Sequence, residues 1–173
     1  MEQRQLIAVL EANLTRHLHW IGAADSKAAF AFTMDTAMLG VLAAVAPQTS
    51  AAWSIPPAIA ASFAAALLLA SLLFVSISAF PRTEGPKGSL IYFGGVSGRD
   101  LAKFKGELRA LTDDGYLDDL ASQCHRNAEI ATRKYRWVQR SLLSMYMSVL
   151  PWAVALCLLF GRTDSLVSLL HLR

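Results

Sequence analysis

The sequence predicts an all-α integral membrane protein with three transmembrane helices and a cytoplasmic helical bundle continuous with the third span. Three observations lead to this fold class: 54% of the 173 residues are hydrophobic, long stretches carry no charge, and Lys and Arg gather between those stretches. The expected parts are an N-terminal amphipathic helix (1–24), a transmembrane hairpin (25–80), a cytoplasmic sensor region (81–140), a third transmembrane helix (141–161) and a short tail (162–173).

Residues 5–21 predict the amphipathic helix. Apolar side chains recur there at three- and four-residue spacing, at Leu6, Ile7, Leu10, Leu14, Leu18 and Ile21. Such a helix can lie on the membrane surface or pack on another helix.

The hairpin follows from a stretch between Asp35 and Arg82 that contains no Asp, Glu, Lys, Arg or His. Prolines at 47, 56 and 57 divide it into limbs at 28–46 and 57–80, with Ser54 as the expected cap of the second limb. At about 1.5 Å per residue, each limb is long enough to cross a hydrocarbon core of about 30 Å. Residues 141–161 form the third uncharged span.

Charge sets the expected orientation. Three Lys or Arg precede the first span, eleven lie between Arg82 and Arg140, and two follow the third span. Because cytoplasmic loops carry the excess of positive charge, the N-terminus and the 81–140 segment are expected in the cytoplasm and the tail outside.

A long helix from about residue 116 to 160 is predicted by a heptad seam that runs through the point where charge ends: Leu117, Ala121, Cys124, Ala128, Ala131, Tyr135, Val138, Leu142 and Met145. Pro151 should kink it.

A shorter helix is expected at 98–111, with Ser97 and Asp100 in an arrangement like a capping box. Residues 80–98 hold too many prolines and glycines for regular helix, so we expect an apolar loop that folds back onto the bundle, with a short extended segment.

The sequence contains no recognisable catalytic or metal-binding motif, so we expect neither enzymatic activity nor a bound cofactor. The "GGVSG" stretch lacks the nucleophile-elbow spacing, and no glycine-rich phosphate loop precedes a Lys-Ser or Lys-Thr pair. His17 and His19 are two residues apart on a helix and therefore point to different faces, which makes them poor metal ligands. Cys124 and Cys157 are expected to act as small packing residues.

A basic stripe is the more informative chemical feature. Arg126, Arg133 and Arg140 are spaced by seven on the long helix. For Arg140 the expected partner is anionic lipid. For Arg126, farther along the helix, two explanations stay open: an anionic ligand between helices, or an ion pair with Asp118, Asp119 or Glu107.

Two features of the first span bear on membrane function. Asp35 places a carboxyl group in an apolar run, so its side chain is expected to face protein, either as a neutral polar contact or as a group that ionises on activation. The expected hydrogen-bond partners are Ser71, Ser76, Ser144, Tyr146 and Ser148. Thr33, Ala37, Gly40 and Ala44 form a ridge of small residues, which predicts a homo-oligomer.

The sequence resembles the transmembrane effectors of Pycsar, a bacterial antiphage system built around a pyrimidine cyclase. The motifs are "ADSKAAFAFT" (24–33), "FPR" (80–82), "SLIYFGG" (89–95) and "LASQCHRNAEIATRKYRWV" (120–138). This resemblance implies functional pairing with a pyrimidine nucleotide cyclase, sensing of cyclic UMP or cyclic CMP, damage to the bacterial inner membrane and abortive infection, without a nucleic acid polymer as partner. Asp35 departs from the neutral amide typical of the family.

A cyclic mononucleotide carries one negative charge and a flat base, so its pocket needs a cation and an aromatic platform. Arg82, Tyr92, Phe93, Arg126 and Arg133 are the expected ligand-binding residues, although Tyr92 and Phe93 can instead be loop anchors. The alternative function is a membrane anchor that assembles through its heptad helix and senses nothing; a small transporter with Asp35 as proton site ranks third.

Overall fold

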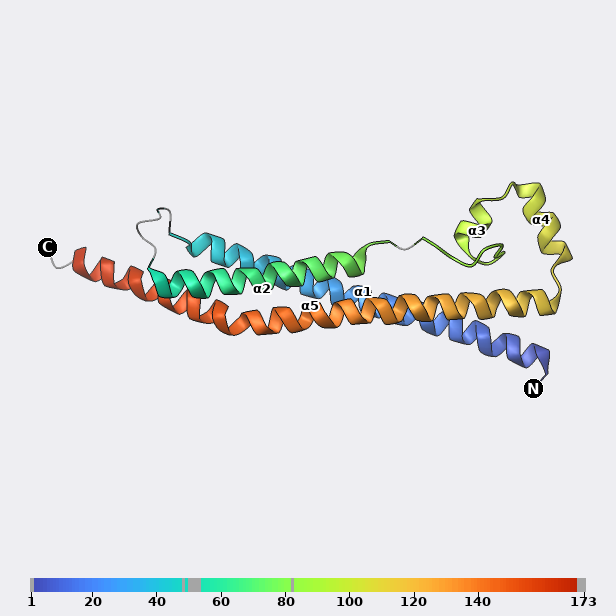
Figure 1. Cartoon of the computed structure of the whole chain (residues 1–173), viewed down its shortest axis with the longest axis horizontal. Helices are drawn as coiled ribbons and strands as arrows, with labels where there is room; N and C mark the ends of the chain where they lie inside the picture. The colour runs from blue at the N-terminus through green and yellow to red at the C-terminus, as the bar shows by residue number, and fades with distance from the viewer. Residues whose placement is uncertain (1, 48, 50–53, 82, 171–173) are drawn as a thin grey trace. The chain divides into compact units, whose positions relative to one another are not determined.

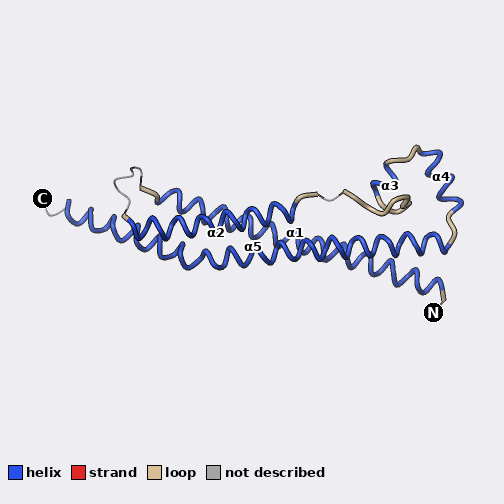
Figure 2. The backbone as a smooth tube through the Cα atoms, viewed as in Figure 1, coloured by secondary structure: helices blue, strands red, loops and turns tan. Residues whose placement is uncertain are grey.

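The computed structural model describes residues 2–170 apart from 48, 50–53 and 82. In that part of the chain all regular structure is helical (Figure 2). The helices are α1 (Gln3–Val45), α2 (Ile55–Ala79), α3 (Phe93–Ser97), α4 (Leu101–Ala110) and α5 (Asp113–Leu170), as Figure 1 shows. Three of them, α1, α2 and α5, are long and apolar enough to cross a membrane. The prediction of an all-helical chain with three helices able to span a membrane is therefore confirmed for the described residues.

The helices α1 and α5 are longer than the sequence pattern indicates. The expected amphipathic helix and the first span form one helix of 43 residues. The helix α5 has 58 residues and remains helical through Pro151. It begins after Thr112, whose hydroxyl accepts a hydrogen bond from the backbone N–H of Gly115 at 3.2 Å.

The segment between α2 and α5 differs from the prediction in two details. The described residues of the 80–98 segment form no strand, and its regular structure is the five-residue helix α3. The cap of α4 is Asp100, whose carboxylate accepts from the backbone N–H of Lys103 at 2.9 Å, whereas the Ser97 hydroxyl donates to the carbonyl of Gly94.

The chain forms two compact units. Unit 1 comprises residues 1–26 and 80–135, and unit 2 comprises residues 27–79 and 136–173. In unit 1 the beginnings of α1 and α5 are joined in parallel by polar contacts, from Gln3 to Asp114 at 2.6 Å and from the Tyr116 hydroxyl to Glu11 at 2.7 Å. The hydrogen bond to the Glu11 carboxylate raises the pKa of Tyr116 above its ordinary value.

The heptad seam of α5 is largely confirmed. Cys124, Ala131, Val138 and Met145 are buried, but Ala121 is exposed and Leu120 takes the inward position. The Cys124 thiol donates to the carbonyl of Leu10 at 3.3 Å, and burial raises its pKa, so this cysteine packs as expected and is a poor thiolate.

Unit 2 contains two apolar clusters, to each of which α1, α2 and α5 contribute. The first consists of Ala28, Ala31, Val75, Val138 and Met145, and the second of Met38, Leu42, Ala64, Leu68 and Ala155. The indole N–H of Trp152 donates to the carbonyl of Met38 at 3.0 Å and so ties α5 to α1 beside the second cluster.

Candidate functional site

The loop of unit 1 is organised by Arg99, whose side chain is only 13% exposed. Its guanidinium pairs with Glu107 at 2.6 Å and donates to the carbonyls of Gly88 at 2.7 Å and Ser89 at 3.0 Å, as well as to Gly95. One planar donor group therefore holds both ends of the 88–99 segment.

The same segment is fastened to α5 through Ser89. The Ser89 hydroxyl accepts from the amide of Gln123 at 2.9 Å and from the backbone N–H of Tyr92 at 2.8 Å, and both Ser89 and Gln123 are buried. The backbone N–H of Leu90 donates to Asp119 at 2.8 Å. The prediction that the loop folds back onto the bundle is confirmed by these bonds.

Tyr92 anchors the loop from within. Its ring fills the space beside two glycines, because a Cβ atom at Gly85 or Gly94 would lie 2.2 or 2.6 Å from ring carbons. Its hydroxyl donates to the carbonyl of Thr83, and its ring contacts that of Phe93 with centroids 4.5 Å apart. Tyr92 is thus a loop anchor, which was one of the two roles predicted for it, whereas the Phe93 side chain is exposed.

Gly95→Ala tests how closely this loop is packed. The added Cβ would lie 2.3 Å from the carbonyl oxygen of Ser89, so the loop must shift. We expect a loss of about 1–3 kcal/mol in local stability, measured by hydrogen exchange over residues 85–99. Gly106→Ala is the control, since a Cβ there meets nothing within 4 Å in the middle of α4. Equal exchange in both variants would contradict the close packing.

A cavity of about 570 Å³, here called the aromatic pocket, lies between the loop, α1 and α5 within unit 1. Apolar side chains dominate its wall, and the polar ones come mainly from α5. The lining residues are Leu14, Leu18, Ile21, Phe80, Pro81, Thr83, Ile91, Tyr92, Phe93, Gln123, Asn127, Ile130 and Lys134. Lys134 is the cation among them, is 13% exposed, and pairs with Asp25 on α1. An apolar wall with a few convergent polar groups is the usual character of a small-molecule site.

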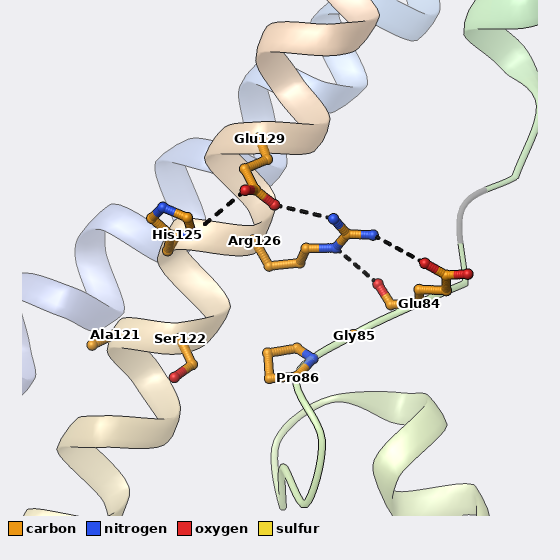
Figure 3. Close-up of a pocket in the computed structure, with 8 residues that line it drawn as sticks. All are labelled: Glu84, Gly85, Pro86, Ala121, Ser122, His125, Arg126 and Glu129. Carbon is orange, nitrogen blue, oxygen red and sulfur yellow. Dashed lines mark hydrogen bonds and ion pairs between the residues drawn. The ribbon is translucent and has the colours of Figure 1, made fainter.

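A second cavity, of about 560 Å³, surrounds Arg126 and is called the Arg126 pocket (Figure 3). The guanidinium donates to Glu129 at 3.0 Å and to the carbonyl of Glu84 at 3.0 Å, with the Glu84 carboxylate at 3.8 Å. Arg126 thus forms ion pairs with Glu84 and Glu129, and the expected partners Asp118, Asp119 and Glu107 are wrong. Asp119 and Glu107 are engaged elsewhere, with Leu90 and Arg99.

The remaining expected ligand residues are distributed differently. Arg133 is exposed and lines neither pocket. Arg140, which was expected to meet anionic lipid, lies over the Trp137 ring at 4.6 Å. Arg82 falls outside the described residues, although Pro81 and Thr83 line the aromatic pocket.

Sequence reasoning missed Gln123, Asn127, Lys134 and the organising Arg99. The first three, with Ile130, recur at steps of four, three and four, which places them on one face of α5. That spacing could have found them in the sequence, whereas nothing local marks Arg99.

In unit 2, Asp35 is completely buried, which confirms that it faces protein. Of the expected partners, Ser71 lies close enough to interact with the Asp35 carboxyl group. Its hydroxyl donates to the backbone carbonyl of Ser141 at 3.0 Å, and among the described residues neither Asp35 oxygen has a partner in full hydrogen-bond geometry. Gly40, in contrast, is exposed, and a Cβ there would meet nothing within 4 Å.

Comparison with known proteins relates this geometry to a family. A family model described as the Pycsar effector protein domain matches residues 9–161. The chain is similar to the Pycsar effector protein PtPycTM of Propioniciclava tarda, at 33% identity over 89 residues, which is 46% of this chain and 44% of that protein. The chain thus aligns with less than half of that relative's length, and no solved structure matches it significantly. Because the family match runs from α1 through the apolar part of α5, the chain belongs to the Pycsar effector family.

Proposed function

We propose that this protein is an antiphage membrane effector that binds a cyclic pyrimidine mononucleotide, cyclic UMP or cyclic CMP, and then impairs the bacterial inner membrane. The aromatic pocket of unit 1 is the observation that carries the proposal, because it offers a small-molecule site in a chain of the Pycsar effector family. A pyrimidine nucleotide cyclase would supply the ligand, and the protein itself would not be an enzyme.

The pocket suits the two parts of such a ligand. Phe93 and Tyr92 offer aromatic faces for a base, and stacking of this kind contributes about 1–3 kcal/mol per base. Asn127 offers an amide, which has both a donor and an acceptor and therefore suits the edge of a pyrimidine. Lys134 offers the positive charge for the cyclic phosphate, which would have to share Lys134 with its partner Asp25, a residue outside the lining of the pocket, or displace that partner.

The Arg126 pocket is the second candidate site. Its arginine is already shared between two carboxylates, so the residues around it do not leave a net positive charge for an anion. Ligand binding there would require Arg126 to exchange Glu84 or Glu129 for phosphate. Arg133 would act only as a more distant attraction from the exposed side of α5.

Titration of the purified full-length chain in lipid nanodiscs with cyclic UMP, cyclic CMP and cyclic AMP tests the proposal. We expect a pyrimidine ligand to bind and the larger purine ligand to bind more weakly, and we expect Phe93→Ala to weaken binding by about 1–3 kcal/mol. Arg126→Ala is the comparison: a loss of about 1.5–3 kcal/mol in that variant would move the site to the Arg126 pocket. If neither pyrimidine nucleotide binds, the anchor function is favoured instead.

The topology expected from charge places unit 1 in the cytoplasm, where a cyclase product is available. Membrane impairment is proposed to involve a homo-oligomer that assembles on the small-residue ridge of α1. Thr33, Ala37, Gly40 and Ala44 are all exposed, and helical geometry puts them opposite the buried face that carries Asp35.

Gly40→Leu is expected to abolish this assembly, because a bulky side chain keeps a second helix from close approach. The measurement is cross-linking in lipid vesicles with and without nucleotide. Ala43→Leu, a similar enlargement at an exposed position off the ridge, should leave the cross-linked species unchanged. A wild-type chain that cross-links only as monomer would count against the homo-oligomer.

A further inference from the structure

Unit 2 has a buried polar layer between its two apolar clusters. Along α1, Asp35 lies between Ala31 of the first cluster and Met38 of the second. Along α2, Ser71 lies in the same way between Val75 and Leu68.

On α5, Ser148 follows Met145 of the first cluster and precedes Ala155 of the second. Asp35, Ser71 and Ser148 are all completely buried. Each of the three helices thus carries a buried oxygen-bearing side chain between residues of the two clusters, and the α5 serine that contacts Ser71 is Ser141, which lies between Val138 and Met145 of the first cluster.

The serine hydroxyls of this layer are already occupied, and Asp35 is not. Ser71 and Ser141 share a hydroxyl contact of 2.9 Å, and Ser148 donates to the carbonyl of Met145 at 2.6 Å. Both Asp35 oxygens lack a partner among the described residues. A buried polar group without partners is costly, and a buried unpaired charge far more so.

No cation of the sequence can neutralise this carboxyl from within the span. Lys27 precedes Asp35 by eight residues on α1, the uncharged stretch of α2 contains no basic residue, and Arg140 is the last basic residue of α5 before residue 161. The arrangement therefore accommodates the neutral acid, and an ionised Asp35 requires water or an external cation.

We propose that Asp35 is the cation-binding group of an ion pathway through unit 2, which the two apolar clusters close in the arrangement described here. The inference rests on the proposed function, since the nucleotide would supply the signal for opening. Water that enters the layer takes the proton of the Asp35 carboxyl, and the resulting carboxylate attracts cations and repels anions.

The layer has the composition that such a site needs. Oxygen ligands from carboxylate and hydroxyl groups suit hard cations, and acidic side chains are a common source of cation selectivity in pores. Hydrophobic constrictions close a pathway by excluding water. In this proposal the two apolar clusters, at Val75 and at Leu68, form those constrictions.

The test is the reversal potential of the full chain in planar bilayers of phosphatidylethanolamine and phosphatidylglycerol under a KCl gradient, with cyclic UMP or cyclic CMP added. We expect the wild-type reversal potential near that of K⁺, Asp35→Asn shifted towards zero, and Asp35→Glu close to wild type. Thr36→Val, a change at an exposed neighbour, is the control. An unchanged reversal potential in Asp35→Asn overturns the inference.

A second arm needs no nucleotide. Leu68→Ser removes a completely buried side chain of the second cluster, so it should admit water and allow a K⁺ leak without ligand. Adding Asp35→Asn should remove the cation preference of that leak. If Leu68→Ser gives a cation-selective leak but the wild-type chain does not respond to nucleotide, the proposed function alone is refuted. If the leak is equally selective with and without Asp35→Asn, this inference alone is refuted. If neither experiment gives a current, both are refuted.

Discussion

Arg99→Met is expected to loosen the 88–99 segment and its tie to α4, and to weaken nucleotide binding strongly as a result. The substitution leaves the carbonyls of Gly88, Ser89 and Gly95 without their charged donor and Glu107 without its partner. Since hydrogen bonds to charged groups contribute about 1.5–3 kcal/mol each, we expect local stability to fall by at least about 2–3 kcal/mol. The measurement is hydrogen exchange and protease cleavage between residues 80 and 100, followed by nucleotide titration.

Two variants sharpen this result. Arg99→Lys keeps the charge but loses the planar fork, so it should fail nearly as badly as Arg99→Met. Arg109→Met, at an exposed position in the last turn of α4, removes the same charge without those acceptors and should behave as wild type. Wild-type affinity in Arg99→Met would mean that the ligand does not depend on this loop.

The second large effect concerns the ion pair of Lys134 and Asp25. Removing the charge of Lys134 and removing that of Asp25 are expected to change nucleotide affinity in opposite directions. Lys134→Met should weaken binding of the cyclic nucleotide by about 1.5–3 kcal/mol, or about 10- to 150-fold, if the ammonium binds the phosphate. Asp25 competes for that ammonium and is about half exposed, so Asp25→Asn should strengthen binding by about two- to fivefold.

Isothermal titration of both variants, at low and at moderate salt, measures the two effects. The gain in Asp25→Asn should shrink as salt screens the charge of the half-exposed Asp25 carboxylate. If both substitutions weaken binding, the ion pair serves the fold of unit 1, and another group binds the phosphate.

The long-range features of the fold followed from the sequence because they depend on patterns that extend over many residues. The three spans were visible as uncharged stretches, and the α5 seam as a heptad that places Cys124, Val138 and Met145 inside. Burial of Asp35 followed from the cost of exposing a carboxyl group to lipid. The spans, the seam and the burial of Asp35 depend on the composition of whole helices, so individual contacts with neighbouring side chains change them little.

The site was less predictable because it is built from contacts between distant segments. Arg126 was singled out by its spacing, but whether it is available depends on Glu84, which is 42 positions earlier in the chain. Lys134 is a pocket residue because α1 and the loop surround it, and its own neighbours in sequence do not show this. Residue type indicated the kind of chemistry, and only the folded chain shows which cation lies beside the aromatic side chains.

The division of the chain into two interleaved units has a consequence for biosynthesis. Unit 1 needs residues 1–26 and 80–135, so its first piece leaves the ribosome long before its second. Since chains fold as they are made from the N-terminus, the apolar face of early α1 has no partner from α5 until both limbs of the hairpin have been synthesised. The aromatic pocket is therefore completed only after both limbs of the hairpin have been synthesised, so a chain that binds nucleotide there, as proposed, can do so only once its two apolar limbs have been made.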